Sequence, residues 1–213
     1  MSKKVTYSRE PKDKDRYTAS KDRAYTAFAG LYDWVVKRLP IWRNWIMQTV
    51  PHIRGERVLE VSFGTGYLLM QYGARFETCG IDYNEKMVAT ARENLASKGI
   101  TAGLQNAAVE SLPYGDETFD CIVNTMAFTG YPDGAKAMSE LRRVLKKGGA
   151  LVMVDVNYPA DRNWLGMSAA RLWASLGDII RDMDELFTGF NFKHTDEEIG
   201  GFGSIHLYVA EKM

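Results

Sequence analysis

The sequence predicts an α/β fold built on a mostly parallel sheet. From residue 57 onward, short apolar runs of strand type alternate with stretches in which apolar residues recur at helical spacing. The first run passes through a turn containing Gly64 and Gly66 directly into an apolar helix start. A second run ends in the acidic Asp82, about 20 residues after that turn, a spacing typical of nucleotide-binding α/β units. Right-handed crossovers between such units make the sheet mostly parallel.

Composition places the chain among soluble globular proteins. Its 213 residues suffice for one domain with a sizeable core, and 46% are hydrophobic and 25% charged. The 27 Lys and Arg residues equal the 27 Asp and Glu residues, which argues against a nucleic-acid partner, since phosphate binding normally needs a basic excess. Cys79 and Cys121 lie in apolar runs and are predicted to be buried free thiols. With no signal peptide and no apolar run of roughly 20 residues, we expect a cytoplasmic protein.

The N-terminal part differs in character from the rest. Residues 1–21 are rich in charged side chains and hold few large aliphatic ones, so we predict a flexible charged tail. Residues 22–213 are predicted to form a single domain. Its first part, residues 22–51, contains two amphipathic helical segments separated by Pro40. Tryptophans and cations mix within residues 34–46, a composition that suits peripheral contact with a membrane surface.

The core, residues 57–213, alternates strands and helices. The first five strands are predicted at residues 57–62, 77–82, 102–106, 119–124 and 150–156. The helices between them are predicted at residues 67–75, 85–98 and 134–146, with Asn84 as a good N-cap for the second. Two further helices are expected at residues 168–176 and 178–187. Two strands are expected after them, at residues 190–195 and 204–211, joined by a loop at residues 196–203.

The turn after the first strand is the predicted ligand site. Gly64 and Gly66 let the backbone approach a bound molecule, and the free N–H groups of the following helix face the same space. Glu60 is a carboxylate in an otherwise apolar strand and suits a cationic or hydroxyl-bearing ligand. Asp82, at the end of the second strand, is placed to accept hydrogen bonds from two ribose hydroxyls. NAD-binding and S-adenosylmethionine-binding folds both use an acidic residue at this position to bind the ribose.

Four motifs recur here in an order that one family uses. Glu60, Ser62, Gly64 and Gly66 match an acidic residue followed by alternating glycines, with serine at the first glycine position. Asp82 matches the second motif. The third reads Asp-Ala-Glu-x-Leu-Pro-Phe in the family and lies here at residues 108–114, and a later signature lies at residues 119–124 and 140–152.

In these motifs the sequence resembles the class I S-adenosylmethionine-dependent methyltransferases. The likeness is strongest to the small-molecule branch that includes the ubiquinone/menaquinone C-methyltransferases, and it covers about residues 58–155. Ala108 stands where the family often has an aspartate that accepts from the adenine amino group. The backbone groups of Ala107 and Val109 are then left to hold the adenine.

The resemblance implies a fold, a cofactor and a set of ligands. The fold would be a Rossmann-like, seven-stranded, mostly parallel sheet with helices on both faces, an antiparallel last strand and an N-terminal helical lid. The cofactor would be S-adenosyl-L-methionine, with no metal. The implied cofactor-binding residues are Glu60, Ser62, Gly64, Gly66, Asp82, Tyr83, Val109, Glu110 and Asn124.

The chemistry expected of such a site needs few catalytic groups. A methyl group on a sulfonium is already activated, so the protein has mainly to align donor and acceptor and exclude water. The sequence carries no Ser-His-Asp order and no Cys/His cluster that would indicate another mechanism. A general base is not assigned, and His206, Asp155 and Tyr32 are the candidates.

The acceptor is expected to bind at the carboxyl end of the sheet. Residues 124–132, 157–164 and 200–204 follow predicted strands there, and together they are apolar with a few hydroxyls and amides. Such a pocket suits a small acceptor that is aromatic, quinone-like or lipid-like.

Other functions remain open at this point. A methyltransferase acting on a phospholipid-type amine at the membrane surface is one alternative. A cofactor-binding pseudoenzyme is another, because Ser62 and Ala108 each depart from the standard motifs. An NAD-dependent oxidoreductase on a similar sheet is disfavoured by the motifs from Ala108 onward.

Overall fold

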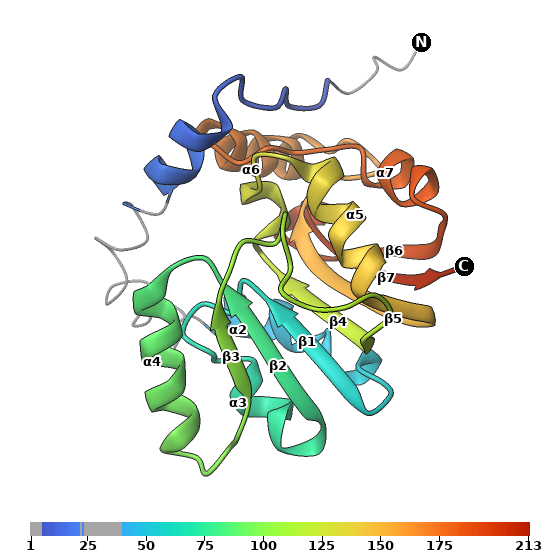
Figure 1. The fold of residues 1–213 in the computed structure, drawn as a ribbon. Helices are drawn as coiled ribbons and strands as arrows, with labels where there is room; N and C mark the ends of the chain where they lie inside the picture. The colour runs from blue at the N-terminus through green and yellow to red at the C-terminus, as the bar shows by residue number, and fades with distance from the viewer. Residues whose placement is uncertain (1–5, 22, 24–39) are drawn as a thin grey trace.

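The computed structural model describes residues 6–21, 23 and 40–213. It contains a seven-stranded sheet of order β3-β2-β1-β4-β5-β7-β6 (Figure 1). The strands are β1 (Arg57–Val61), β2 (Glu77–Asp82), β3 (Gly103–Asn106), β4 (Phe119–Thr125), β5 (Leu145–Val156), β6 (Phe192–Gly200) and β7 (Ile205–Lys212). Strands β1 to β5 pair in parallel, and β7 is antiparallel to both of its neighbours. The predicted sheet, including its antiparallel last strand, is confirmed.

Helices cover both faces of the sheet, as predicted. They are α2 (Pro40–Met47), α3 (Leu69–Tyr72), α4 (Glu85–Ala96), α5 (Gly134–Val144), α6 (Trp164–Ser175) and α7 (Met183–Gly189). Alternate residues of β1 point to opposite faces, so Val58 packs in one core cluster and Leu59 in the other. Helices α2, α3, α4 and α6 contribute to the first cluster, and α5 and α7 to the second. In the described part of the chain no helix is long and apolar enough to cross a bilayer.

Side-chain caps begin several of these helices. Asn84 Oδ1 accepts a hydrogen bond from Met87 N at the start of α4, which confirms the predicted N-cap. Asn163 caps α6 in the same way. That cap starts α6 at Trp164, four residues earlier than the sequence pattern predicts.

Several predicted elements differ from the structure. The helix predicted at residues 178–187 begins only at Met183, and the strand predicted at residues 150–156 begins at Leu145. Strand β6 continues to Gly200, although residues 196–203 were expected to be a loop. Its acidic residues lie on an edge strand, where charged side chains can face solvent while the backbone pairs with β7. The helix predicted at residues 67–75 is the short α3 followed by a 3₁₀ turn at residues 73–75.

Residues 6–21 contact the sheet domain, which differs from the free, flexible tail that the composition predicts. Ser8 N donates to Ile180 O at 2.9 Å, and Ile180 N donates to Ser8 Oγ at 3.1 Å. Tyr17 Oη donates to Gly177 O at 2.6 Å, and Lys21 pairs with Asp178 at 2.9 Å. These contacts are polar and long-range, so a count of aliphatic residues does not reveal them. Of the predicted lid, residues 40–51 are described and form α2 and the start of a 3₁₀ turn; the helix expected before Pro40 lies outside the described residues.

Candidate functional site

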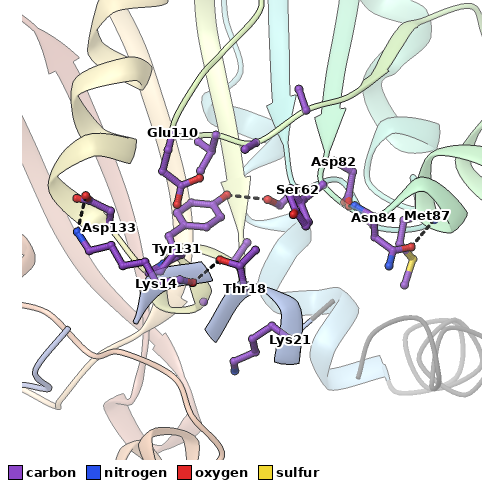
Figure 2. A pocket seen from close by; sticks show the side chains of 18 of the residues that line it. Lys14, Thr18, Lys21, Ser62, Asp82, Asn84, Met87, Glu110, Tyr131 and Asp133 are labelled. Carbon is purple, nitrogen blue, oxygen red and sulfur yellow. Dashed lines mark hydrogen bonds and ion pairs between the residues drawn. The ribbon is translucent and has the colours of Figure 1, made fainter. Parts of the chain in front are cut away.

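A cavity of about 610 Å³ opens at the carboxyl ends of β1 to β4 (Figure 2). This is the edge at which α/β folds bind ligands. Its wall comes from the turn after β1, the end of β2, residues 107–110 after β3, and residues 125–133 after β4. Residues 14–21, which are helical, cover it from the side opposite the sheet.

The turn after β1 has the backbone conformation that a glycine motif would require. Ser62, Gly64 and Gly66 all have positive φ values, of 55°, 56° and 75°. Ser62 therefore adopts the left-handed region that its family position normally gives to glycine. Its hydroxyl lies 2.8 Å from Tyr131 Oη. A Cβ at Gly66 would lie 2.9 Å from Leu95 Cδ1, so this glycine is needed for the packing of α4 as well as for the turn.

Asp82 joins the first two motifs. Its Oδ2 accepts from Gly64 N at 2.8 Å and its Oδ1 accepts from Asn84 N at 2.9 Å. The carboxylate lies at the cavity wall and is 8% exposed. These two backbone N–H groups hold the carboxylate in place at the end of β2. Tyr83, the next residue, also lines the cavity and is half-exposed.

Glu60 does not line the cavity. It is 1% exposed and accepts a hydrogen bond from Tyr72 Oη at 2.8 Å, beneath α3. Burial raises the pKa of its carboxyl to about 8. Side chains alternate along β1, so Glu60 points to the face that α3 covers and reaches no further than Tyr72. Its role as a cofactor-binding residue stays a prediction from its motif position.

The segment after β3 supplies an acidic side chain to the cavity. Ala107, Ala108, Val109 and Glu110 all line it. Ala108 has only a methyl side chain, so it offers no side-chain acceptor to the adenine, as the sequence predicts. Glu110 Oε1 is buried and has no hydrogen-bond partner among the described residues. Burial raises the pKa of Glu110, and Figure 2 shows its carboxyl directed into the space beside Tyr131.

Tyr131 is a cavity residue that the motifs did not single out. Its Oη lies between Ser62 Oγ, at 2.8 Å, and Asn124 Nδ2, at 2.7 Å. Asn124 is fully buried behind it and does not line the cavity, and its predicted cofactor contact stays a prediction. Burial raises the pKa of Tyr131 above its ordinary value, which keeps the phenol neutral. The sequence predicted only that residues 124–132, which include Tyr131, face the acceptor.

The candidate bases lie away from the cavity. Asp155 accepts from Thr129 N at 3.1 Å and from Thr129 Oγ1 at 2.9 Å, and burial raises its pKa to about 6. His206 Nδ1 lies 2.7 Å from Asp196 Oδ1. Both are on β5 and β7, whose ends do not reach the cavity wall, and each fixes a neighbouring segment. Tyr32 lies outside the described residues.

Two of the three segments expected to bind the methyl acceptor also lie outside the cavity. Residues 125–132 line the cavity in part, whereas 157–164 and 200–204 contribute nothing to it. The cavity instead includes Lys14, Asp15, Thr18 and Lys21, which sequence reasoning assigned to the tail. The helical spacing of Lys14, Thr18 and Lys21 was the available signal.

Comparison with known proteins agrees with this geometry. The family described as "Methyltransferase domain" matches residues 59–153, which include the turn after β1, Asp82 and the segment after β3. A phosphatidylethanolamine N-methyltransferase from Cereibacter sphaeroides is 38% identical over 112 residues, which are 51% of this chain and 55% of that protein. Over this region the chain is similar to the class I S-adenosylmethionine-dependent methyltransferases.

Further relatives are similar to the chain over a comparable length. A ubiquinone/menaquinone biosynthesis C-methyltransferase from Yersinia enterocolitica is 34% identical over 125 residues, covering 56% of this chain and 50% of the relative. The chain thus spans about half the length of the curated relatives it matches. Among solved structures, a Thermotoga maritima S-adenosylmethionine-dependent methyltransferase, described as a possible histamine N-methyltransferase, has a TM-score of 0.70 at 18% identity, covering 90% of this chain and 99% of that chain. That likeness shows the fold.

The residues of this methyltransferase fit the methyl donor that the family uses. S-adenosylmethionine carries hydrogen-bond donors at its ribose hydroxyls, ammonium and adenine amino group. The cavity presents acceptors in return: Asp82 at the end of β2, and the unpartnered oxygen of Glu110. The left-handed turn at Gly64 brings backbone close to the same space.

Proposed function

We propose that this methyltransferase transfers a methyl group from S-adenosylmethionine to a small apolar or amphipathic acceptor in the same cavity. The observation that carries the proposal is the division of the cavity into two kinds of wall. Asp82 and the turn after β1 supply polar groups suited to a nucleoside, whereas Met126, Ala127 and Pro132 supply an apolar surface after β4. An acceptor with an apolar body would lie against that second wall.

The roles of the chain's own residues follow from their positions. S-adenosylmethionine, when bound, supplies a methyl group that is already activated on sulfur. Asp82 and Gly64 hold the nucleoside end, and Tyr131, fixed by Ser62 and Asn124, forms a rigid polar wall. Residues 14–21 cover the cavity and exclude water from the reacting groups. Alignment and exclusion of water would then supply most of the rate enhancement.

Transfer of a radiolabelled methyl group tests this function. The purified chain would be incubated with labelled S-adenosylmethionine and separate panels of phenols, quinone-like rings, small amines and phosphatidylethanolamine in mixed micelles. We expect label in one apolar or amphipathic class and none in a highly charged small molecule. Saturable cofactor binding with no transfer to any class would favour the pseudoenzyme, and binding of NADH in its place would favour the oxidoreductase.

A phospholipid-type amine is the second candidate acceptor, and Glu110 is the observation in its favour. A buried carboxyl with one unpartnered oxygen suits an ammonium or amine, with which it would form a charge-assisted hydrogen bond. Its raised pKa lets it take the proton that an amine must lose before it accepts a methyl group. The relative named as a phosphatidylethanolamine N-methyltransferase is in keeping with this acceptor class.

The variant Glu110→Gln separates the two acceptor classes. For an amine acceptor we expect KM to rise about tenfold, because a hydrogen bond to a charged group is lost. A neutral phenol or quinone-like acceptor should be affected far less. Glu93→Gln, which changes an exposed glutamate on α4, is the control. If Glu110→Gln weakened transfer to amines and neutral rings alike, Glu110 would have a general structural role and the amine assignment would be withdrawn.

A further inference from the structure

Helix α6 exposes an apolar face that packs against nothing in the described structure. Trp164 is 75% exposed, Leu172 is 61% and Leu176, at its end, is 64%. Leu165 is 38% exposed and lies on the same face, because positions seven and eleven residues apart coincide on a helix. The opposite face of α6 is buried at Gly166 and Ala170. We call these four exposed residues, together with Phe202, the α6 patch.

Phe202 extends this surface from the turn between β6 and β7. Its side chain is 66% exposed. Its backbone has φ 58° and ψ 37°, a left-handed conformation that is unfavourable for a bulky residue. Asn163 Nδ2 donates to Phe202 O at 2.8 Å, which ties this turn to the start of α6 beside Trp164. A strained turn that holds an aromatic side chain in solvent, next to a second exposed aromatic residue, indicates a binding surface.

The chemistry of the α6 patch suits a lipid surface. Ser168 Oγ and Ser175 Oγ, on the exposed side of α6, donate to the helix carbonyls of Trp164 and Leu172, so they present little unsatisfied polarity. Arg171 is the only charged residue of α6; it is exposed, and no described carboxylate pairs with it. An apolar helix face with a tryptophan at one end suits the headgroup region, and Arg171 is the cation of α6 that an anionic headgroup would meet.

The membrane contact predicted from the tryptophans of residues 34–46 is not supported where that segment is described. Trp42 packs against Trp173 of α6 in a tilted arrangement, with ring centroids 6.1 Å apart. Trp45 packs so closely on Gly200 that a Cβ there would collide with its indole ring. Both side chains therefore face the protein and support α6 from its inner side. The aromatic residues exposed on this side of the described structure are Trp164 and Phe202, whereas the exposed Tyr83 lies at the cavity.

We propose that the α6 patch docks this methyltransferase on a bilayer that contains anionic headgroups, with Arg171 facing a headgroup phosphate. The patch adjoins the cover of the cavity, because Tyr17 and Lys21 bond to Gly177 and Asp178 immediately after α6. Figure 1 shows α6, in orange, beside the blue helix of residues 14–21. Docking would bring this cover to the lipid surface, where an amphipathic acceptor is concentrated. The docking itself does not depend on the acceptor proposed above.

Vesicle co-sedimentation of the full chain, without cofactor or acceptor, tests the docking. The vesicles would be phosphatidylcholine alone and a mixture of phosphatidylcholine with phosphatidylglycerol. We expect wild-type protein to bind the mixture more tightly. The double variant Trp164→Ser/Phe202→Ser should need at least about tenfold more lipid for half-maximal binding. Arg171→Gln should weaken binding about fivefold, and only to the anionic mixture.

Matched controls separate docking from loss of fold. Met213→Ser removes an apolar side chain that is 51% exposed at the C-terminus, and it should bind like wild type. Circular dichroism should give each variant the wild-type spectrum, since the substituted side chains are exposed. The proposal is overturned if wild type binds neither vesicle, or if the double variant binds as wild type does. It is also overturned if light scattering without lipid shows a wild-type dimer that the double variant abolishes, because a second copy would then cover the patch.

Discussion

Replacing Glu60 by glutamine should change how the stability of this methyltransferase depends on pH. Burial beneath α3 raises the pKa of Glu60 from its ordinary 4.5 to about 8. Between these two values the folded protein retains a proton that the unfolded chain has released. The free energy of unfolding of the wild type therefore falls as pH rises through this window, by about 1.4 kcal/mol per pH unit. Below pH 4.5 both states are protonated and the effect vanishes.

The size of the effect follows from the width of the window. The two pKa values differ by 8 − 4.5 = 3.5 units, so the full difference is about 5 kcal/mol, as an upper bound at high pH. Glutamine is uncharged, and it keeps an oxygen that can accept the hydrogen bond from Tyr72. Relative to wild type, Glu60→Gln should become more stable by about 1.4 kcal/mol with each unit of rising pH.

Urea unfolding of both proteins at about pH 5, 6 and 7 measures this slope directly. Other groups that titrate in this range, Asp155 among them, are present in both proteins and cancel in the difference. Glu93→Gln, at an exposed glutamate, serves as the control for removing a carboxylate. If the stability difference between wild type and Glu60→Gln stayed constant with pH, the carboxyl would not be held protonated in the fold and the reasoning would be refuted.

Three further outcomes can be checked. Asp82→Ala should abolish calorimetric binding of S-adenosylmethionine. The control Asp120→Ala also removes a carboxylate that accepts two backbone N–H groups, but at the opposite end of the sheet, and it should leave binding intact. Equal losses of binding in both variants would mean that Asp82→Ala acts by disturbing the fold. Ser62→Gly should be more stable than Ser62→Ala by about 1 kcal/mol in urea unfolding, because only glycine relieves the left-handed backbone; equal stabilities would contradict the strain. Gly66→Ala should lower stability by about 2 kcal/mol, since φ is +75° and the new methyl group would meet Leu95; an unchanged melting temperature would show that the turn relaxes freely.

Much of the sheet could be predicted because its signals are local. Each parallel strand is a short apolar run bounded by turn residues, and the run at Val58 leads into a motif whose spacing to Asp82 is characteristic. The capping role of Asn84 is likewise encoded within three residues of sequence. In each of these cases the decisive interaction lies within one strand–turn–helix unit.

The remaining features depend on contacts between distant segments. Glu60 was expected in the cavity from its motif position, but the side-chain alternation of β1 and the partner Tyr72 place it beneath α3. Tyr131 forms part of the site because Asn124, near the end of β4, and Ser62, in the turn after β1, converge on its hydroxyl. The chain contains eleven tyrosines, and nothing in the local pattern distinguishes this one. His206 and Asp155 looked catalytic by residue type, and the register of β5 with β7 keeps them outside the cavity.

The attachment of residues 6–21 also bears on how the protein is made. Ser8 and Ile180 bond across 172 positions, and Tyr17 reaches Gly177 across 160. During synthesis the N-terminal segment leaves the ribosome first, yet its binding surface is not completed until α6 and the residues after it have followed. The cover of the cavity would therefore be among the last parts to assemble, after β1 to β5 have paired. A nascent chain stalled before residue 177 would lack Gly177, the acceptor of the Tyr17 hydroxyl, and with it one of the bonds that hold the cover in place.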